Sequence, residues 1–421
     1  MRRCLKVSFT LLLFLFLCFN EAAAGEVLSW VDCIREAAKN NPDLISAEEE
    51  VKQSQAGKKI TASSLFPQID SNLRASSAKA ATAGASDTYT YGVTGSQLIF
   101  DGAKTMNNIN AASENINAAK QSFRFTSAAV RYRLRVAFVS LLRAQEMLRI
   151  TQEIYDIRRD NLQLITLRYA SGLEHKGALL TAQADLADAE YGILKAQRDL
   201  EVAQRDLVKE MGRGQLTSLA VNGDFTVQDS AKVKPDFEVL AKNNPSLLQL
   251  VAQKNAAEYG VKSAYANFSP TLTGQAGANK SGSHWSPTGD QWNLGLTLSM
   301  PIFEGGLRFA QVSQAKALLN QLREDARSRK DSVILILEQA WAMLQDTMDN
   351  VGVQEKMLIA NEVRSEIGQA QYSLGIMTFD NWIIIEDNLV GSKKAHLNSR
   401  ADALLAEAYW IQAKGETLEY D

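Results

Sequence analysis

The sequence predicts a mixed α and β protein, mostly α-helical, built from two copies of one structural unit. A short segment occurs twice, as Phe100-Asp101-Gly102 and as Phe303-Glu304-Gly305, 203 residues apart. Each copy ends a run of alternating apolar and polar residues and begins a long stretch rich in Ala, Asn, Gln and Leu. The hydrophobic period therefore changes from about 2 to about 3.6, which indicates a strand-to-helix corner where glycine permits unusual backbone angles. Only seven prolines occur in 421 residues, which favours long helices.

The constant spacing extends well beyond these corners. Residues 38–42 (Ala-Lys-Asn-Asn-Pro) recur as 241–245, and Pro67 recurs as Pro270. Matches at one offset over about 130 residues indicate an internal duplication rather than chance. The predicted division is a signal peptide over 1–24, a first repeat over 25–212, a connector over 213–234 and a second repeat over 235–421.

The first 24 residues are predicted to be a secretion signal. A basic start precedes an apolar run over residues 7–19, which is too short to span a bilayer comfortably. Ala22–Ala24 supplies small residues for cleavage before Gly25, with a retained membrane anchor as the alternative. Cys18 is a candidate for lipidation, but the preceding Leu17 is larger than lipoprotein signals favour, so this point stays open.

Each half opens with a helix that ends at an Asn-Asn-Pro sequence. In the first half, Ser29 and Asp32 have the spacing of a capping box. Pro42 suits the first turn of a second helix, which runs to about Ser64. The second half repeats this pattern around Pro235 and Pro245.

Two strands follow in each half, in hairpins over 68–100 and 271–303. In the second hairpin, Trp292, Leu294 and Leu296 alternate with polar residues or glycine, as expected of a strand with two different faces. Twelve residues extend about 40 Å, and a tilt of about 45° makes this match the hydrocarbon thickness of a bilayer. Residues 77–88 are predicted to be the first hairpin loop. A strand pair in a soluble sandwich is the alternative.

Long helices follow both corners, over about 103–168 and 307–371, in a first helical pair over 103–210 and a second over 306–414. Some 65 residues without proline make a rod of roughly 100 Å. The returning helix of the first half has apolar residues at seven-residue spacing from Leu179 to Leu207, with alanine three residues after each of the first four. This heptad pattern lets helices approach closely in a coiled coil. In the connector, a short strand is predicted near Phe225–Val227.

Several classes of function lack support in the sequence. A formal net charge of −3 gives no basic field for nucleic acid. The three histidines are far apart and lack metal-ligand spacing, and there is no P-loop or dinucleotide fingerprint. Cys33 has no histidine partner and is interpreted as a packed apolar residue. Asp101 and Glu304 are interpreted as helix starts, where a carboxylate meets the positive end of the helix dipole. We therefore predict no enzymatic activity, no cofactor and no metal.

Four strands per chain are too few to close a barrel in a membrane, because the smallest such barrels have eight strands. An open sheet edge is not tolerated in lipid, so several chains must share one barrel. Two chains give eight strands and three chains give twelve. A helix of about 100 Å must also bury an apolar stripe, which a ring of such helices provides.

The sequence resembles the TolC family of outer-membrane efflux proteins. The resemblance covers residues 27–415, and its marks include Leu65-Phe66-Pro67, Phe268-Ser269-Pro270, both corners, and the Tyr-x-x-Gly turns at Tyr169–Gly172 and Tyr372–Gly375. It implies a TolC-like channel-tunnel: a homotrimer whose twelve-stranded barrel lies in outer-membrane lipid and whose helical tunnel extends into the periplasm. It also implies passive export with a periplasmic adaptor protein and an inner-membrane pump of the RND or ABC type.

The resemblance further implies that the turns at Tyr169, Gly172, Tyr372 and Gly375 dock the adaptor and carry the closed gate. Relatives with an acidic gate have aspartates six and nine residues after the second turn glycine, where this chain has Asn381 and Ile384. The cation-binding gate is therefore not transferred. Asp380 remains a candidate gate residue, and the alternative is that it caps the returning helix.

Two other functions remain open from the sequence. Within the duct class, the chain could serve type I protein secretion rather than efflux of small molecules, because substrate choice belongs mainly to the pump. In a different class, a non-transporting periplasmic coiled-coil scaffold would explain the signal and the heptads. It would not explain two alternating strand pairs at matched offset.

Overall fold

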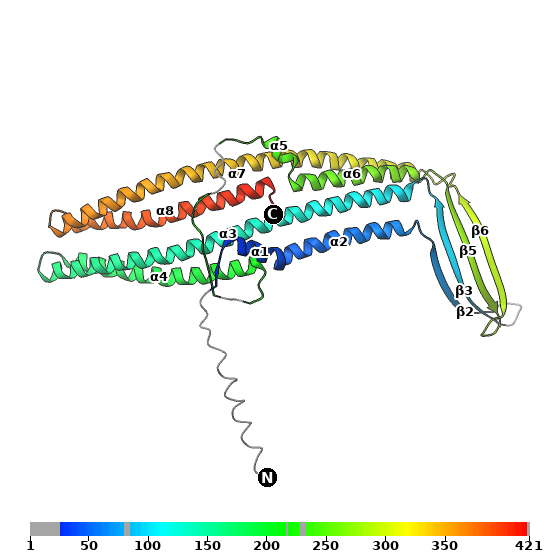
Figure 1. Cartoon of the computed structure of the whole chain (residues 1–421), viewed down its shortest axis with the longest axis horizontal. Helices are drawn as coiled ribbons and strands as arrows, with labels where there is room; N and C mark the ends of the chain where they lie inside the picture. Colours follow the sequence, from blue (N-terminus) through cyan, green and yellow to red (C-terminus); the bar gives the residue numbers. More distant parts are fainter. Residues whose placement is uncertain (1–25, 80–84, 216–217, 228–232, 419–421) are drawn as a thin grey trace, which may run out of the picture.

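The computed structural model describes residues 26–79, 85–215, 218–227 and 233–418. The predicted signal peptide lies outside these residues. The chain forms a long helical rod, and a four-stranded sheet extends from one end of it (Figure 1). Both helical turns lie at the opposite end of the rod, so the sheet and the turns are separated by the length of the longest helices (Figure 1).

The elements occur twice in the same order. The first set is α1 (Trp30–Asn40), α2 (Pro42–Ser63), β2 (Gln68–Lys79), β3 (Ala85–Phe100), α3 (Lys104–Ala170) and α4 (Lys176–Met211). The second set is α5 (Phe237–Lys242), α6 (Pro245–Ala266), β5 (Thr271–Gly282), β6 (Gly289–Ser299), α7 (Leu307–Ser373) and α8 (Phe379–Lys414). Two short strands, β1 (Glu26–Leu28) and β4 (Leu219–Val221), lie outside this scheme.

The two sets keep their offset of 203 residues at both ends of four element pairs, namely α2 and α6, β2 and β5, α3 and α7, and α4 and α8. The helices α3 and α7 each contain 67 residues, and α4 and α8 each contain 36. The predicted fold class, mostly helical with paired strands and very long helices, is confirmed.

Each long helix is accompanied by two shorter helices placed end to end. Asn41 caps α2 and donates through its side-chain amide to the Glu210 carbonyl at the end of α4, at 2.8 Å. Asn244 makes the equivalent bond from α6 to the Ala413 carbonyl of α8, at 3.0 Å. These two contacts, which we call the joints, satisfy carbonyls that a helix end leaves without intrahelical partners.

The helix starts follow the sequence signals. Ser29 and Asp32 form the predicted capping box of α1, and Pro42 occupies the first turn of α2. Asp236 caps α5, one residue after Pro235. Cys33 is buried in the core beside this capped helix, and burial raises the pKa of its thiol to about 12.

The four long strands form one antiparallel sheet in the order β2-β3-β5-β6. The hairpin loop predicted over 77–88 is shorter than expected, because β2 reaches Lys79 and β3 begins at Ala85. Small polar residues pair across the strands there, as in Ser77 opposite Asp87. Such residues form a regular ladder when both strands are long, so their composition alone did not mark the loop.

The connector strand predicted near Phe225–Val227 is wrong. The strand lies at Leu219–Val221 and pairs in parallel with β1, which the sequence did not predict. Leu219 and Val221 are buried in the core, whereas Phe225 packs against it as a side chain from an irregular segment. Phe225 also lies under the Arg400 guanidinium at 4.9 Å. Its apolar character serves packing rather than strand pairing.

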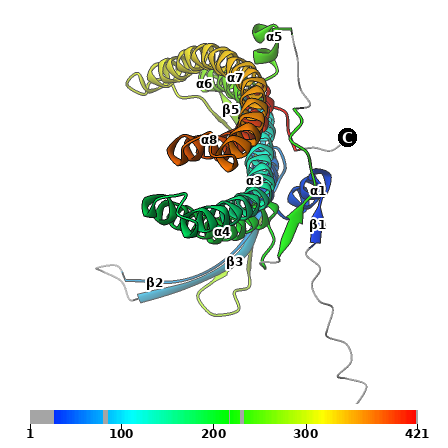
Figure 2. The ribbon, with the colours of Figure 1, turned by 90° about the vertical axis from the view of Figure 1, so that its left-hand side faces the viewer.

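The helices form one curved layer when viewed along the rod, with α4 and α7 toward its two edges and α3 and α8 between them (Figure 2). Contacts between α3 and α8 join the two helical hairpins. The predicted alanine seam of α4 is buried against α3, with every alanine from the heptad pattern under 9% exposed: Ala182, Ala189, Ala196 and Ala203.

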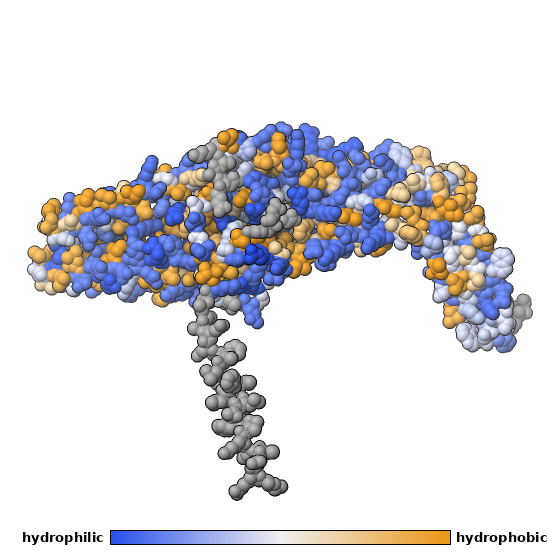
Figure 3. All heavy atoms as spheres, viewed as in Figure 1, coloured by the Kyte–Doolittle hydropathy of each residue, from blue (hydrophilic) through white to orange (hydrophobic). Residues whose placement is uncertain are grey.

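Hydrophobic side chains gather on the surface where the rod meets the sheet and near the turns, and the middle of the rod is mostly hydrophilic (Figure 3). Among the described residues, no helix combines the length and the apolar character needed to cross a membrane.

Candidate functional site: the corners and the turns

Each strand-to-helix corner contains two consecutive residues in the left-handed backbone region. Gly102 and Ala103 have φ of 67° and 66°, and Gly305 and Gly306 have φ of 60° and 87°. At Gly102, a Cβ atom would lie 2.3 Å from the Cβ of Ser269, so glycine is required by both the backbone and the neighbour. The glycine predicted at the change of period therefore makes the sharp corner.

The two corners use their acidic residue differently. The Asp101 carboxylate accepts hydrogen bonds from the Thr105 amide at 2.7 Å and from its hydroxyl at 2.5 Å. Glu304 instead pairs with Arg308 at 2.6 Å, and Arg308 also donates to the Asn267 carbonyl. Both carboxylates therefore stabilise the first turn of a 67-residue helix.

Large apolar side chains remain exposed around both corners. Phe100 is 50% exposed and Phe303 is 88% exposed. We call this set the collar: Leu65, Phe66, Ile99, Phe100, Phe268, Met300, Ile302, Phe303, Leu307 and Phe309. A contiguous apolar region of this kind indicates contact with a membrane or another protein.

Each turn at the other end of the rod closes with a left-handed glycine, at φ of 72° for Gly172 and 76° for Gly375. Leu173 donates its amide to the Arg168 carbonyl at 2.8 Å, and Ile376 donates to the Gln371 carbonyl at 2.9 Å. This is the Schellman arrangement, which satisfies the last carbonyls of the long helices. Nothing lies within 4 Å of a Cβ built on either glycine.

Tyr372 is fully buried at the second turn and holds the two hairpins together. Its ring stacks on Trp382 at 4.3 Å, and the Arg168 guanidinium covers it at 4.6 Å. Its hydroxyl donates to the Glu174 carboxylate at 2.8 Å, while Arg168 donates to the Tyr372 carbonyl at 3.2 Å. Burial, then the Glu174 carboxylate, raises the pKa of the Tyr372 hydroxyl. We call Arg168, Glu174 and Tyr372 the turn lock.

Tyr169, the counterpart of Tyr372, is 40% exposed. The residues that would correspond to the lock by the repeat are Gln371 and Met377, which supply neither a cation nor a carboxylate. The sequence prediction treated the two turns alike, whereas the structure gives their tyrosines different environments.

A second tie between the hairpins lies further along the rod. The buried Arg158 of α3 pairs with Asp387 of α8 at 2.5 Å and lies 3.8 Å from Asp185 of α4. Burial raises the pKa of Asp185. Glu386 is also buried and accepts a hydrogen bond from Ser365 at 2.6 Å.

Asp380 is exposed in the first turn of α8, and the helix cap is Thr378. The alternative in which Asp380 caps this helix is therefore wrong. The side chain is left facing solvent near the second turn, where the candidate gate residue was expected.

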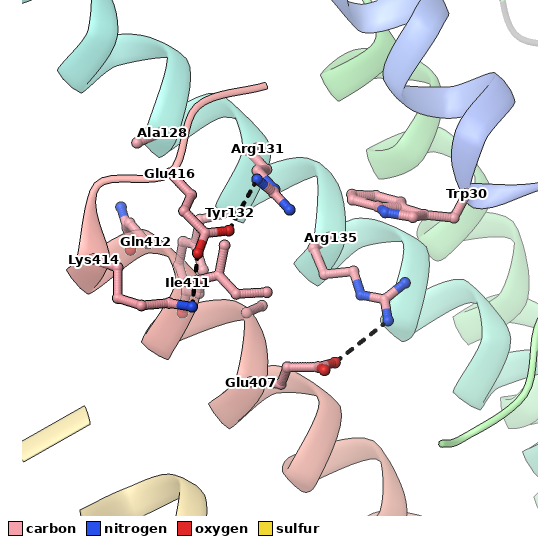
Figure 4. Close-up of a pocket in the computed structure, with 11 residues that line it drawn as sticks. Trp30, Ala128, Arg131, Tyr132, Arg135, Glu407, Ile411, Gln412, Lys414 and Glu416 are labelled. Carbon is pink, nitrogen blue, oxygen red and sulfur yellow. Dashed lines mark hydrogen bonds and ion pairs between the residues drawn. The ribbon is translucent and has the colours of Figure 1, made fainter. Parts of the chain in front are cut away.

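A cavity of about 360 Å³ lies at the middle of the rod between α1, α3, α8 and the C-terminal segment (Figure 4). Arg135 pairs with Glu407 at 3.7 Å and lies over the Trp30 ring at 4.9 Å. Glu416 pairs with Arg131 and with Lys414. These contacts fix the C-terminal segment to α3, and Leu418 is buried in the core beyond them. The cavity therefore belongs to the packing of the chain end.

Within the described ranges, no group of three or more His, Cys, Asp or Glu side chains is placed to hold a metal ion. Sequence reasoning found the turn tyrosines and glycines but missed Arg168, Glu174 and Trp382. Their repeat counterparts are Gln371, Met377 and Leu179. This divergence between otherwise matching copies was the available signal.

Comparison with known proteins identifies the family. The chain matches the outer membrane efflux protein family over residues 33–213 and 238–413. The outer membrane efflux protein BepC of Brucella suis is 22% identical, with 94% of this chain and 87% of BepC covered. The alkaline protease secretion protein AprF of Pseudomonas aeruginosa is 25% identical, with 60% of this chain and 58% of AprF covered. The crystal structure of CusC matches with a TM-score of 0.82 at 18% identity, covering 91% of each chain.

The chain has the fold of the transmembrane channel protein CusC, in which a four-stranded sheet follows long paired helices. The chain belongs to the outer membrane efflux protein family. The predicted family, efflux role and outer-membrane location are thereby confirmed, and the family is one of channels rather than enzymes.

Proposed function

We propose that three copies of this chain form a passive duct through which an inner-membrane pump expels small molecules. The observation that carries the proposal is the separation of two unlike ends on one rigid rod. Four strands and the collar lie at one end, and two exposed turns lie at the other, separated by helices of about 100 Å. The repeats over 25–212 and 235–421 would place six similar helical hairpins around one axis.

The sheet has one face suited to lipid. Trp292, Leu294 and Leu296 of β6 are between 72% and 80% exposed. They lie opposite Ala278, Ala276 and Gly274 of β5, so small and large apolar residues share this face. The collar continues the apolar surface to the corner. Burying this surface in hydrocarbon would contribute about 25 cal/mol for each Å² removed from water.

The turns are the proposed docking surface for a periplasmic adaptor. Leu173 and Ile376 occupy equivalent positions after the turn glycines and are 67% and 73% exposed. Tyr169 adds a half-exposed ring at the first turn. Paired apolar side chains on rigid caps suit recognition by an α-helical hairpin, which would place its own apolar residues between them.

The turn lock is the proposed closed gate of each protomer. Arg168, Glu174 and Tyr372 join the two hairpins at the tunnel entrance, so separating the hairpins must break a charge-assisted hydrogen bond. The exposed Asp380 carboxylate is proposed to contact cations that enter. Block of single-channel current by divalent cations should weaken in Asp380→Asn, and an unchanged block would remove Asp380 from this role.

The proposal is tested by deleting the gene and complementing it with variants. Wild type should restore export of pump substrates and yield heat-modifiable trimers in outer-membrane fractions. Leu173→Asp and Gly172→Asp should keep trimers but lose export and adaptor crosslinking. Val239→Asp, at an exposed site in the middle of the rod, is the matched control and should behave as wild type. A monomeric periplasmic rod would favour the scaffold alternative.

The similarity to AprF favours type I protein secretion as a second candidate. The pump and adaptor that co-purify after crosslinking distinguish the two. Loss of a secreted protein from the medium, without increased sensitivity to small toxic molecules, would select secretion.

A further inference from the structure

The contact between α3 and α8 within the chain contains a small group of packed apolar side chains, called here the apolar step, beside an ion pair. Ile150 and Ile154 of α3 pack with Leu397 of α8 in one buried cluster. Glu153 of α3 pairs with Lys393 of α8 next to this cluster. We call this contact the inner seam.

Each residue of the inner seam has a counterpart in the other repeat, 203 positions away. A displacement of 203 residues turns α3 into α7 and α8 into α4. The apolar step becomes Val353 and Met357 of α7 with Leu194 of α4. The ion pair becomes Lys356 of α7 with Glu190 of α4, in which the two charges have exchanged helices.

These counterpart residues lack partners inside the chain. Val353, Met357 and Leu194 are 55%, 53% and 51% exposed. Lys356 and Glu190 are exposed and have no ion-pair partner within the described part of the chain. Since α4 and α7 lie at opposite edges of the curved layer, they cannot meet within one protomer (Figure 2).

We propose that α7 of one copy packs against α4 of the next in the register of the inner seam, with Lys356 bound to Glu190 of the next copy. This outer seam rests on the proposed ring of three copies and specifies its interface. A head-to-tail contact of this kind closes into a ring when the rotation between copies fits. Three outer seams and three inner seams would then alternate around the tunnel.

The exchanged charges give the interface its selectivity. If α4 of a neighbour took the place of α8 against α3, Glu190 would face Glu153. If α8 of a neighbour took the place of α4 against α7, Lys393 would face Lys356. Both wrong pairings place like charges together, whereas the apolar steps alone would not distinguish them. The reversed ion pair thus directs each helix to its own partner.

The same displacement applied to the sheet gives a compatible pairing of strands. Gly95 of β3 lies opposite Ala276 of β5 within the chain. The same displacement places Leu298 of β6 opposite Leu73 of β2 in the next copy. Both leucines are exposed, at 66% and 67%, and the pairing keeps apolar residues on one face of a continuous sheet.

Charge exchange tests the outer seam. Lys356→Glu and Glu190→Lys should each reduce the amount of trimer that survives in detergent on an unheated gel, and the double variant should restore it. The matched control combines Lys356→Glu with Glu201→Lys, on the same helix about 16 Å from Glu190, and should not restore the trimer.

Cysteine crosslinking fixes the register on a Cys33→Ala background. Met357→Cys with Leu194→Cys should give oxidised dimers and trimers, and Met357→Cys with Val202→Cys should not. Stable trimers with neither this crosslink nor rescue by charge exchange would overturn the outer seam and leave the proposed duct standing. A protein that is monomeric in the outer membrane would overturn both.

Discussion

The two turns carry the same motif and have opposite environments. Tyr372 is fully buried under Arg168 and against Trp382, whereas Tyr169 is 40% exposed. Both glycines have nearly the same left-handed backbone, so the difference does not come from the turns themselves. It comes from what the other hairpin offers: Arg168 and Glu174 reach Tyr372, and their counterparts are Gln371 and Met377.

The duplication within the chain therefore repeats the backbone conformation of each half. It does not repeat the side-chain contacts that one half makes with the other. The second turn is completed by side chains of the other hairpin, whereas the tyrosine of the first turn stays partly exposed. The inner seam shows the same asymmetry between the repeats. Its ion pairs Glu153–Lys393 and Arg158–Asp387 form within the chain, and their counterparts in the other repeat do not. The counterpart of the second pair is Asn361 with Ala184, so the outer seam has fewer charged ties and should separate more easily.

The largest effect is expected from Tyr372→Ala. Removing a buried aromatic ring costs about 3–5 kcal/mol. Amides around both turns should lose protection against hydrogen exchange by a comparable opening free energy. The matched Tyr169→Ala variant should change the opening free energy by less than about 0.5 kcal/mol when the chain is measured as a monomer. Equal effects at the two tyrosines would contradict the comparison.

A smaller loss of stability is expected when Arg168 and Glu174 of the turn lock are replaced by the residue types found at their counterparts, in the double variant Arg168→Gln with Glu174→Met. The Tyr372 hydroxyl would lose its charged acceptor, at a cost of about 1.5–3 kcal/mol. In planar bilayers the tunnel should then open more often. The reverse change, Gln371→Arg with Met377→Glu, should reduce opening by giving Tyr169 of a neighbouring copy new partners. No change in conductance in either variant would exclude the lock as a gate.

Alkaline pH should weaken the lock without mutation. Because the pKa of Tyr372 is raised in the folded state, its contribution is complete below the ordinary tyrosine pKa of about 10 and is lost as pH rises from there toward the folded pKa. Channel opening should therefore increase above about pH 10 in wild type. Tyr372→Phe should abolish this dependence, whereas Tyr169→Phe should retain it.

The smallest difference between the turns is expected for glycine replacement. Gly172→Ala and Gly375→Ala each force a left-handed alanine, at a cost of about 1–2 kcal/mol, with no neighbour within 4 Å to add to it. Thermal unfolding should shift equally for both variants. A much larger effect at one glycine would mean that its turn has a second constraint.

The sequence was sufficient for features that depend on local chemistry. The corner glycines, the capping box at Ser29 and the alanine seam of α4 follow from backbone geometry and periodicity, and the structure contains all three. The strand at Leu219–Val221 could not be predicted, because it pairs with Glu26–Leu28, nearly 200 residues earlier. The lock likewise joins residues of different hairpins, which no local pattern encodes.

The joints at Asn41 and Asn244 have a mechanical consequence. Each long helix runs unbroken from turn to corner, while the companion path is interrupted where one helix ends and the next begins. The glycines that end α4 and α8 pack closely against the adjoining helix of the companion path. A Cβ on Gly212 would lie 2.2 Å from the Asn40 carbonyl oxygen, and a Cβ on Gly415 would lie 2.4 Å from the Pro245 ring. The helical path is therefore continuous on one side of the rod and interrupted at mid-length on the other. Close packing and one side-chain hydrogen bond in each half hold the interrupted path together, so a substitution at either joint would uncouple the turn end from the sheet end.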